Sequence, residues 1–323
     1  MTATNLYCVA KARVIAGFVF VLCVLAGCVS LPQTDALRSE GGQGLPPRAE
    51  LDSVPFFAQE EFQCGPAALA MALSAAGVSV SPDALVDEVY IPARKGSLQV
   101  EMLASARRHG RLAYELAPEL KDVFAEVAAG NPVIVLQNQG LWSFYPYWHY
   151  AVVIGYDLEK RQVLLHSGAK ARRAMAIGLF EFLWIDGQRW SMVALDPSRP
   201  PASAREGPLA IAAAALEKAG RIAEAERAYA ALLQRWPGNL VGLMGLGNAA
   251  YARGRTADAE AVFRRAASAH PLVAAAHNNL AQTLADQGKL EAALEAARQA
   301  VRLGGPDQPA AQATLEEILR KRQ

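Results

Sequence analysis

The spacing of hydrophobic positions changes along the chain and divides it into parts. Between residues 51 and 198, hydrophobic positions first recur at helical intervals, and helices are predicted over Pro66 to Ala76, from Ser81 onward, over Ser97 to Arg108 and over Pro118 to Ala129. Four β-rich runs follow: NPVIVLQN, HYAVVIGYD, RQVLLHS and WSMVALD. Because helices followed by an antiparallel sheet are typical of α+β architecture, we predict an α+β domain over residues 51–198.

A different pattern, with a period of 34 residues, starts near Leu209. Equivalent positions recur at this interval of 34: Gly220, Gly254 and Gly288; Ala225, Ala259 and Ala293; Pro237 and Pro271. A glycine turn between two helices, with a proline after the second, resembles the tetratricopeptide repeat. Three such units give enough stacked core for a small solenoid. We therefore predict an all-α tetratricopeptide-repeat solenoid over residues 209–323, with a polar capping helix from Gln308.

The resemblance to the tetratricopeptide repeat implies a protein partner. The concave face of such solenoids usually binds a peptide or another protein. Candidate contacts on the first helices are Asn248, Asn278 and Asn279, with ordinary solvated positions as the alternative.

The first residues are predicted to form an export signal rather than part of the fold. Lys11 and Arg13 precede an uncharged apolar stretch, Val14 to Gly27, which is too short for a comfortable membrane span. Its end, LAGC, resembles a bacterial lipobox, in which the cysteine is lipidated and becomes the new N-terminus. The resemblance implies a lipoprotein signal peptide over residues 1–27 and lipidation of Cys28; an ordinary secretory signal or a single anchor is the alternative. In either case the body is exported.

Two segments poor in periodic hydrophobic positions connect these parts. LPQTDALRSEGGQGLPPRAE, residues 31–50, is rich in proline, glycine and charge, so a tether is predicted over residues 28–50. SRPPASAREGP predicts a linker over residues 199–208. Val29 stands where an aspartate often signals retention in the inner membrane. The expected location is therefore the bacterial cell envelope, on the periplasmic side, with a lipid anchor in the outer membrane.

Composition removes several classes of function. The chain has 323 residues and 52% of them are hydrophobic, which leaves room for about two domains. A net charge of +1 without a basic run argues against a nucleic-acid partner. Scattered histidines offer no clustered ligands, and GGQG at residues 41–44 does not follow a strand, so neither a metal nor any other cofactor is predicted.

Cysteine usage directs attention to one thiol. Cys8 and Cys23 lie in the segment that would be removed and Cys28 would carry lipid, so the mature chain keeps Cys64 alone. Exported proteins usually pair their cysteines in disulfides. In QCGPAALAMAL, Cys64 precedes a predicted helix, whose N-terminus would stabilise a thiolate and lower its pKa. Cys64 is therefore a candidate nucleophile, with a small buried hydrophobe as the alternative.

A cysteine nucleophile needs a base, and the chain contains five histidines. His109 ends a helix beside two arginines, and His270 and His277 fall in the repeats. This leaves His149 and His166. His149 begins a strand directly after an aromatic loop and could face Cys64 across a cleft. The aromatic residues of the loop could wall that cleft or simply pack the loop: Trp142, Phe144, Tyr145, Tyr147 and Trp148.

Two motifs together point to a family. QEEFQCGPAALAMAL, followed by HYAVVIGYD, resembles the papain-like cysteine peptidases of the bacteriocin-processing type, family 39 of the cysteine class. The resemblance covers about residues 51–198 and implies that Cys64 is the nucleophile and His149 the general base. It also implies a glutamine that helps to form an oxyanion hole. We assign this role to Gln59, with Gln63 as a competitor.

The chain departs from that family at the acid that orients the histidine. The next strand ends in VLLHSG, which places His166 or Ser167 where relatives have an aspartate. A neutral His166 could accept a hydrogen bond from His149 but supplies no negative charge, and we name it as the third member. Asp157 is better suited to a turn, and Asp196 comes too late in the chain.

The combined hypothesis is an exported, lipid-anchored cysteine peptidase that hydrolyses a bond of an exported peptide or protein. Its repeats would dock a protein. A catalytically weak or inactive adaptor is the alternative, since the orienting acid is missing. Acyl transfer by the same residues is a third hypothesis.

Overall fold

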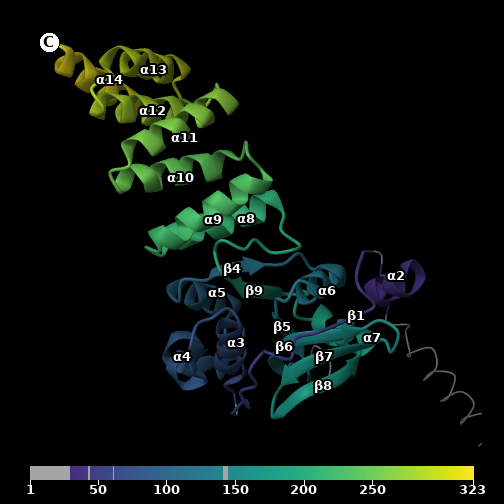
Figure 1. The fold of residues 1–323 in the computed structure, drawn as a ribbon. Coiled ribbons are helices and arrows are strands. Elements are labelled where there is room, and N and C mark those ends of the chain that lie inside the picture. The colour runs from purple at the N-terminus through teal and green to yellow at the C-terminus, as the bar shows by residue number, and fades with distance from the viewer. Residues whose placement is uncertain (1–29, 43, 61, 141–144) are drawn as a thin grey trace, which may run out of the picture.

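The computed structural model describes residues 30–323 except 43, 61 and 141–144. An α+β domain and a stack of helices are visible in Figure 1, as the sequence pattern predicts. The predicted signal peptide and Cys28 lie outside the described residues. Within the part that the structure describes, no helix is both long and apolar enough to cross a bilayer.

The α+β domain is built on one seven-stranded antiparallel sheet, ordered β4-β9-β5-β6-β7-β8, with β1 added beside β6. The strands are β1 (Arg48–Glu50), β4 (Leu112–Glu115), β5 (Val133–Asn138), β6 (Trp148–Asp157), β7 (Gln162–Ser167), β8 (Lys170–Ala176) and β9 (Ser191–Leu195). A two-stranded ribbon joins β2 (Tyr90–Ile91) and β3 (Gly96–Ser97) through a 3₁₀ turn (Pro92–Arg94).

Helices cover both faces of this sheet. One face carries α3 (Cys64–Ala75), α4 (Pro82–Val89) and α5 (Gln99–Arg108), and the other carries α6 (Leu120–Ala128) and α7 (Ile177–Ile185). Alternate residues of β5 enter different cores: Ile134 packs with α3, whereas Val133 and Val135 pack with α6. Successive side chains of a strand point to opposite faces, so burial on both faces explains the continuous hydrophobic run.

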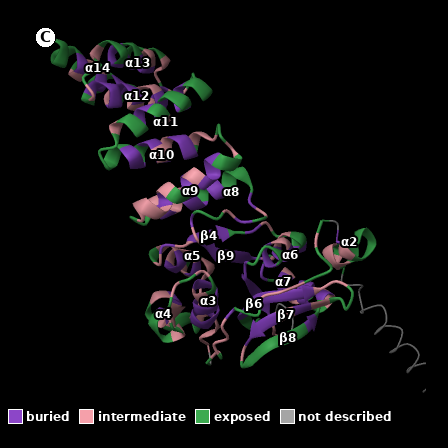
Figure 2. Cartoon of the chain, in the orientation of Figure 1, coloured by how far each residue is buried: buried purple, intermediate pink, exposed green. Residues whose placement is uncertain are grey.

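The predicted elements of this domain are present, and several further ones, among them β4, β8 and α7, are not predicted by the pattern. Ser81 caps α4 by accepting the Ala84 N–H, as expected. β8 escapes the pattern because KARRAMA is charged; it is an exposed strand at the sheet edge (Figure 2), where charge discourages pairing with another chain. β4 is short, and α7 is hydrophobic around its circumference and so lacks a helical period.

The predicted tether over residues 28–50 is wrong for two of its segments. Residues Pro32–Glu40 form helix α2 and Arg48–Glu50 form β1, which pairs with β6. The fully buried carboxylate of Glu181 on α7 accepts the backbone N–H groups of Gln33 and Thr34. A buried carboxylate must be paired, and the unsatisfied N–H groups at a helix start provide partners.

The predicted linker over residues 199–208 is also fastened. The buried carboxylate of Glu126 accepts hydrogen bonds from the backbone N–H and the hydroxyl of Ser203, at 2.7 and 2.6 Å. Ala204 is buried, and the first helix of the stack begins at Glu206 rather than at 209. Composition alone does not reveal these contacts, since both depend on residues distant in sequence.

The helical stack contains three antiparallel pairs and a last helix. They are α8 (Glu206–Lys218) with α9 (Ile222–Arg235), α10 (Leu240–Ala252) with α11 (Thr256–Ala269), α12 (Ala274–Asp286) with α13 (Leu290–Leu303), and α14 (Gln308–Arg322). α8 packs on β4, and its Leu209 and Leu216 share one hydrophobic core with Tyr114 of that strand. The first helical pair therefore completes the core of the α+β domain.

Candidate active site

Cys64 is the first residue of α3, a helix whose next nine residues are all buried. The next two residues, Gly65 and Pro66, suit the close packing at the start of this helix. A Cβ on Gly65 would overlap Ser97 of the β2–β3 ribbon, so only glycine fits there. Pro66 is compatible with the first turn because its missing N–H would have no helical partner. The Cys-Gly-Pro sequence thus places a thiol at the edge of a closely packed helix.

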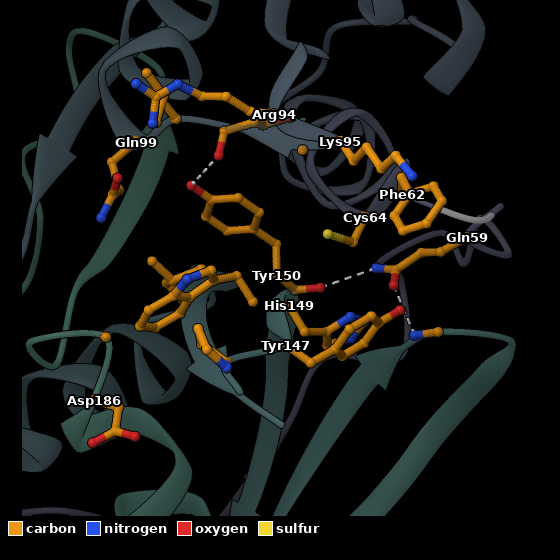
Figure 3. Close-up of a pocket in the computed structure, with 18 of the residues that line it drawn as sticks. Gln59, Phe62, Cys64, Arg94, Lys95, Gln99, Tyr147, His149, Tyr150 and Asp186 are labelled. Atoms are coloured by element: carbon orange, nitrogen blue, oxygen red, sulfur yellow. Dashed lines mark hydrogen bonds between the residues drawn. The ribbon is translucent and has the colours of Figure 1, made fainter. Parts of the chain in front are cut away.

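The thiol lines a cavity of about 680 Å³. Cys64, His149 and Gln59 lie around it in Figure 3, as the sequence predicts. Residues of the β2–β3 ribbon and of the segment after α7 complete the wall: Arg94, Lys95, Gly96, Ser97, Asp186, Gly187 and Gln188. These two segments come from opposite faces of the sheet, so the cavity depends on the complete fold of the domain.

His149 is held by a serine. It lies on β6 opposite Gln137 of β5, and 7% of its surface is exposed. Its Nε2 lies 2.9 Å from Ser167 Oγ at the end of β7. Nδ1 has no hydrogen-bond partner among the described residues, and is the ring nitrogen left for the thiol. Ser167 therefore occupies the position expected of the orienting residue.

His166, predicted as the third member, does not contact His149. Its Nε2 lies 3.2 Å from the carbonyl oxygen of Val54, and its Nδ1 accepts the backbone N–H of Arg172. The cause is the pleat of β7: adjacent residues point to opposite faces, so only one of His166 and Ser167 can face the site. The two aspartates considered for the orienting role do not bond His149 either. Asp157 accepts the Lys160 N–H in a turn, and Asp196 accepts the hydroxyl of Ser198.

Gln59 is oriented by two hydrogen bonds. Its Oε1 accepts the backbone N–H of Gly168 at 2.9 Å, and its Nε2 donates to the carbonyl oxygen of Tyr150 at 3.1 Å. These partners fix which end of the amide faces the cavity. The second N–H on Nε2 is left for a ligand, whereas the competing Gln63 does not line the cavity.

Burial favours the neutral form of both reacting groups, Cys64 and His149. Burial raises the pKa of the Cys64 thiol, and hydrogen bonds from the backbone N–H groups of Tyr150 and Gly65 oppose this only in part. Burial lowers the pKa of His149 to about 4, with a further contribution from the positive charge of Arg173. The sequence-based expectation of a lowered thiol pKa is wrong, since desolvation outweighs the helix N-terminus.

The aromatic loop contributes only in part. Tyr147 and Trp148 line the cavity and are about half exposed, at 51% and 48%. Trp142 and Phe144 lie outside the described residues, and Tyr145 is exposed without lining the cavity. Sequence reasoning missed the cavity walls formed by residues 94–99 and 186–188, because nothing local to these segments indicates that they meet Cys64. Across the described ranges, no group of three or more histidine, cysteine or acidic residues could hold a metal.

Comparisons with known proteins match different parts of the chain to different families. Residues 51–184 match the Peptidase_C39 like family, and residues 212–269 and 244–309 match the tetratricopeptide repeat. None of the curated proteins matches the sequence. A solved structure from Bacillus anthracis, described as a C39-like peptidase, shares 19% identity over 46% of this chain and 97% of its own, with a TM-score of 0.39.

Two further structures are similar to the helical part. The O-GlcNAc transferase of Thermobaculum terrenum is 28% identical over 36% of this chain and 23% of its own, with a TM-score of 0.33. The type III secretion translocator chaperone SycD of Yersinia enterocolitica is 21% identical over 35% of this chain and 83% of its own, with a TM-score of 0.34. The chain thus joins a segment that matches the Peptidase_C39 like family to segments that match the tetratricopeptide repeat.

Proposed function

We propose that the protein is a cysteine peptidase in which Cys64 and His149 hydrolyse a peptide bond. The observation that carries the proposal is the arrangement of the cavity. One thiol, one imidazole whose Nδ1 bonds no described residue, and one oriented amide line the same 680 Å³ space. Membership of residues 51–184 in a peptidase family supports the same chemistry.

The reaction proceeds through an acyl-enzyme. Cys64 Sγ attacks the peptide carbonyl carbon while its proton passes to His149 Nδ1, and the developing oxyanion is stabilised by the Cys64 backbone N–H and Gln59 Nε2. The C–N bond breaks, and the departing amine takes the proton from His149. Water then attacks the thioester, with His149 as base, to release a carboxylic acid and restore the thiol.

A hydroxyl at the third position has a chemical consequence. Ser167 Oγ can hold the ring of His149 by a hydrogen bond but adds no negative charge to stabilise an imidazolium. Proton transfer from Cys64 to His149 is therefore concerted with attack, rather than completed beforehand. We expect slower turnover than with a carboxylate at this position.

The remaining parts of the proposal concern location and partners. The N-terminal sequence supports export and lipid attachment at Cys28 on the periplasmic side of a bacterial envelope. The substrate is then an exported peptide or protein. The repeats support docking of a protein, so that substrate choice is shared between the cavity and the solenoid.

Hydrolysis is tested with the full chain and a mixture of synthetic peptides in H₂¹⁸O. Each newly formed C-terminus should carry ¹⁸O, and cleavage should disappear in Cys64→Ala and fall strongly in His149→Ala. His277→Ala, in the repeats, is the matched control and should cleave normally. Cleavage that survives Cys64→Ala would refute the proposal, while products that acquire an added amine instead of ¹⁸O would indicate acyl transfer.

A non-catalytic adaptor is the second candidate. The observation that favours it is Ser167 in place of an acid, together with the neutral resting pair. It predicts a folded chain that cleaves no peptide in the same mixture.

A further inference from the structure

The cavity carries two positively charged side chains that hydrolysis does not use. Arg94 and Lys95 lie at the turn of the β2–β3 ribbon, line the cavity and are exposed. Neither forms an ion pair with a carboxylate among the described residues, whereas arginines such as Arg172 and Arg205 each bind two acidic side chains. A cation that faces a cavity and pairs with no described carboxylate is a candidate to bind an anionic ligand.

The ribbon that carries these cations is fastened to the catalytic helix. Ser97 fills the space above Gly65, and its carbonyl oxygen accepts the hydroxyl of Tyr150 at 3.2 Å. Tyr150 follows His149 on β6, so the ribbon contacts elements that carry both reacting groups. The turn therefore holds a defined position at the edge of the site.

Lys95 is placed by a strained turn and an aromatic ring. Its φ is 48°, in the left-handed region that non-glycine residues rarely adopt, and the same is true of Phe62 at 63°. The ammonium group of Lys95 lies 5.4 Å from the ring centroid of Phe62, two residues before Cys64. Such strain persists only where surrounding contacts impose it, and it is concentrated at functional sites.

Two described acidic residues, Asp186 and Glu60, also line the cavity. Asp186 accepts a hydrogen bond from Asn138 and lies at the far end of the cavity from Lys95 in Figure 3. Glu60 lines the cavity beside Gln59 and makes no ion pair with a described residue. The cavity thus has a positive wall at the ribbon, and a cleft with walls of low dielectric concentrates the field of such charges.

We propose that Arg94 and Lys95 form a subsite for a carboxylate of the peptide substrate. The inference rests on the proposed function, which it deepens by naming a substrate class. The carboxylate is supplied either by an aspartate or glutamate side chain or by the C-terminus of the peptide. Arginine can bind it through two hydrogen bonds and lysine as a point charge.

The test measures the field at the thiol without any need for hydrolysis. The full chain is alkylated with iodoacetate, which is anionic, and with iodoacetamide, which is neutral, and both rates at Cys64 are read from the peptide that carries it by mass spectrometry. In Arg94→Gln/Lys95→Gln the ratio of the iodoacetate rate to the iodoacetamide rate should fall by about threefold or more. Any change in the pKa of the thiol affects both rates alike, so the ratio reports only the field that acts on the charge of the reagent.

The matched control removes two positive charges elsewhere. Lys121 and Arg199 are exposed and form no ion pair with a described residue, so Lys121→Gln/Arg199→Gln should leave the ratio unchanged. An equal ratio in the wild type and in Arg94→Gln/Lys95→Gln would overturn the subsite. If that variant does not fold, the ratio is followed in the wild type from low to high NaCl: a fall supports the subsite, and a constant ratio overturns it.

Peptide cleavage then separates the two sources of the carboxylate. Peptides with one glutamate, and the same peptides with glutamine, are compared with free and amidated C-termini. A preference for glutamate over glutamine that persists in the amidated peptides identifies a side chain, and a preference for the free over the amidated C-terminus, with either residue, identifies the C-terminus. Cleavage that shows neither preference overturns the subsite but leaves hydrolysis in place. If the alkylation ratio falls in Arg94→Gln/Lys95→Gln as expected but no peptide is cleaved, hydrolysis alone is refuted.

Discussion

The catalytic cavity and the helical repeats are assembled from contacts of different range. In the cavity, Gln59 bonds Tyr150 and Gly168, which lie 91 and 109 residues further along the chain. In the repeats, the turns at Gly220, Gly254 and Gly288 adopt the same left-handed φ of 74°, 72° and 74°, each between two consecutive helices. The comparison teaches that a repeat is specified by its own residues, whereas the site exists only when the whole α+β domain is folded.

The first helical pair, α8 and α9, lies between these two regions. Its removal by truncation is expected to have the largest effect on stability. A chain ending at Arg205 loses α8 and α9, whose Leu209, Leu216, Tyr229 and Leu232 belong to the core beneath the sheet. Each buried side chain of this kind contributes about 1.5–3 kcal/mol, which together matches a total stability of about 5–15 kcal/mol. We expect no cooperative thermal transition for this truncation.

A chain ending at Gly238 is the matched control. It keeps the first pair and removes only later repeats, which form a separate hydrophobic core. Its α+β domain should melt cooperatively by circular dichroism and retain cleavage of short peptides. Cooperative unfolding of the shorter chain would show that the first pair belongs with the repeats alone.

Two glycines, one at the start of α3 and one in α8, differ in how closely their surroundings are packed. Gly65→Ala places a methyl group against Ser97, so we expect a loss of about 1–3 kcal/mol in the free energy of unfolding and a displaced thiol with little activity. Gly207→Ala, in α8, meets no atom within 4 Å and should be neutral or slightly stabilising. Urea denaturation measures both. Equal effects of the two substitutions would contradict the close packing at the start of α3.

The residue that bonds His149 Nε2 is the next position to change. Ser167→Asp supplies a carboxylate to His149 Nε2, and we expect kcat/KM to rise by about tenfold, the effect of roughly one pKa unit on the imidazole. His166→Asp is the control and should not activate, because that side chain bonds Val54. Activation by His166→Asp alone would restore the role first predicted for that position.

The pH dependence gives the smallest expected effect. The pKa of His149 is lowered to about 4, so its neutral, basic form is present above that pH. Activity should persist at pH 5 and decline only as the pH falls through about 4. In Ser167→Asp the decline should move to higher pH, because a carboxylate favours the imidazolium. A profile of kcat/KM that declines near the ordinary histidine pKa of about 6.5 would contradict the buried neutral ring.

Features that depend on residues close together in the sequence were predictable, and features that depend on distant residues were not. The repeats were predicted from a 34-residue period, and Cys64, His149 and Gln59 from motifs on single segments. The prediction of His166 as the third member is wrong, because adjacent residues of β7 point to opposite faces of the sheet and the strand's own sequence does not show which of His166 and Ser167 faces the site. The predictions of a free tether and a free linker are wrong because Glu181 and Glu126, which are distant in sequence, form hydrogen bonds with these segments. The cavity walls were missed for the same reason.

The central claim is that Cys64 is a nucleophile assisted by His149, and acylation by an activated ester tests it most directly. The full chain is mixed with an N-acylglycine p-nitrophenyl ester, stopped with acid, and the mass of the peptide that carries Cys64 is measured over time. We predict a transient thioester on Cys64, removable by hydroxylamine, that forms about 10²- to 10⁴-fold more slowly in His149→Ala. Acylation at the same rate in wild type and His149→Ala would contradict the account.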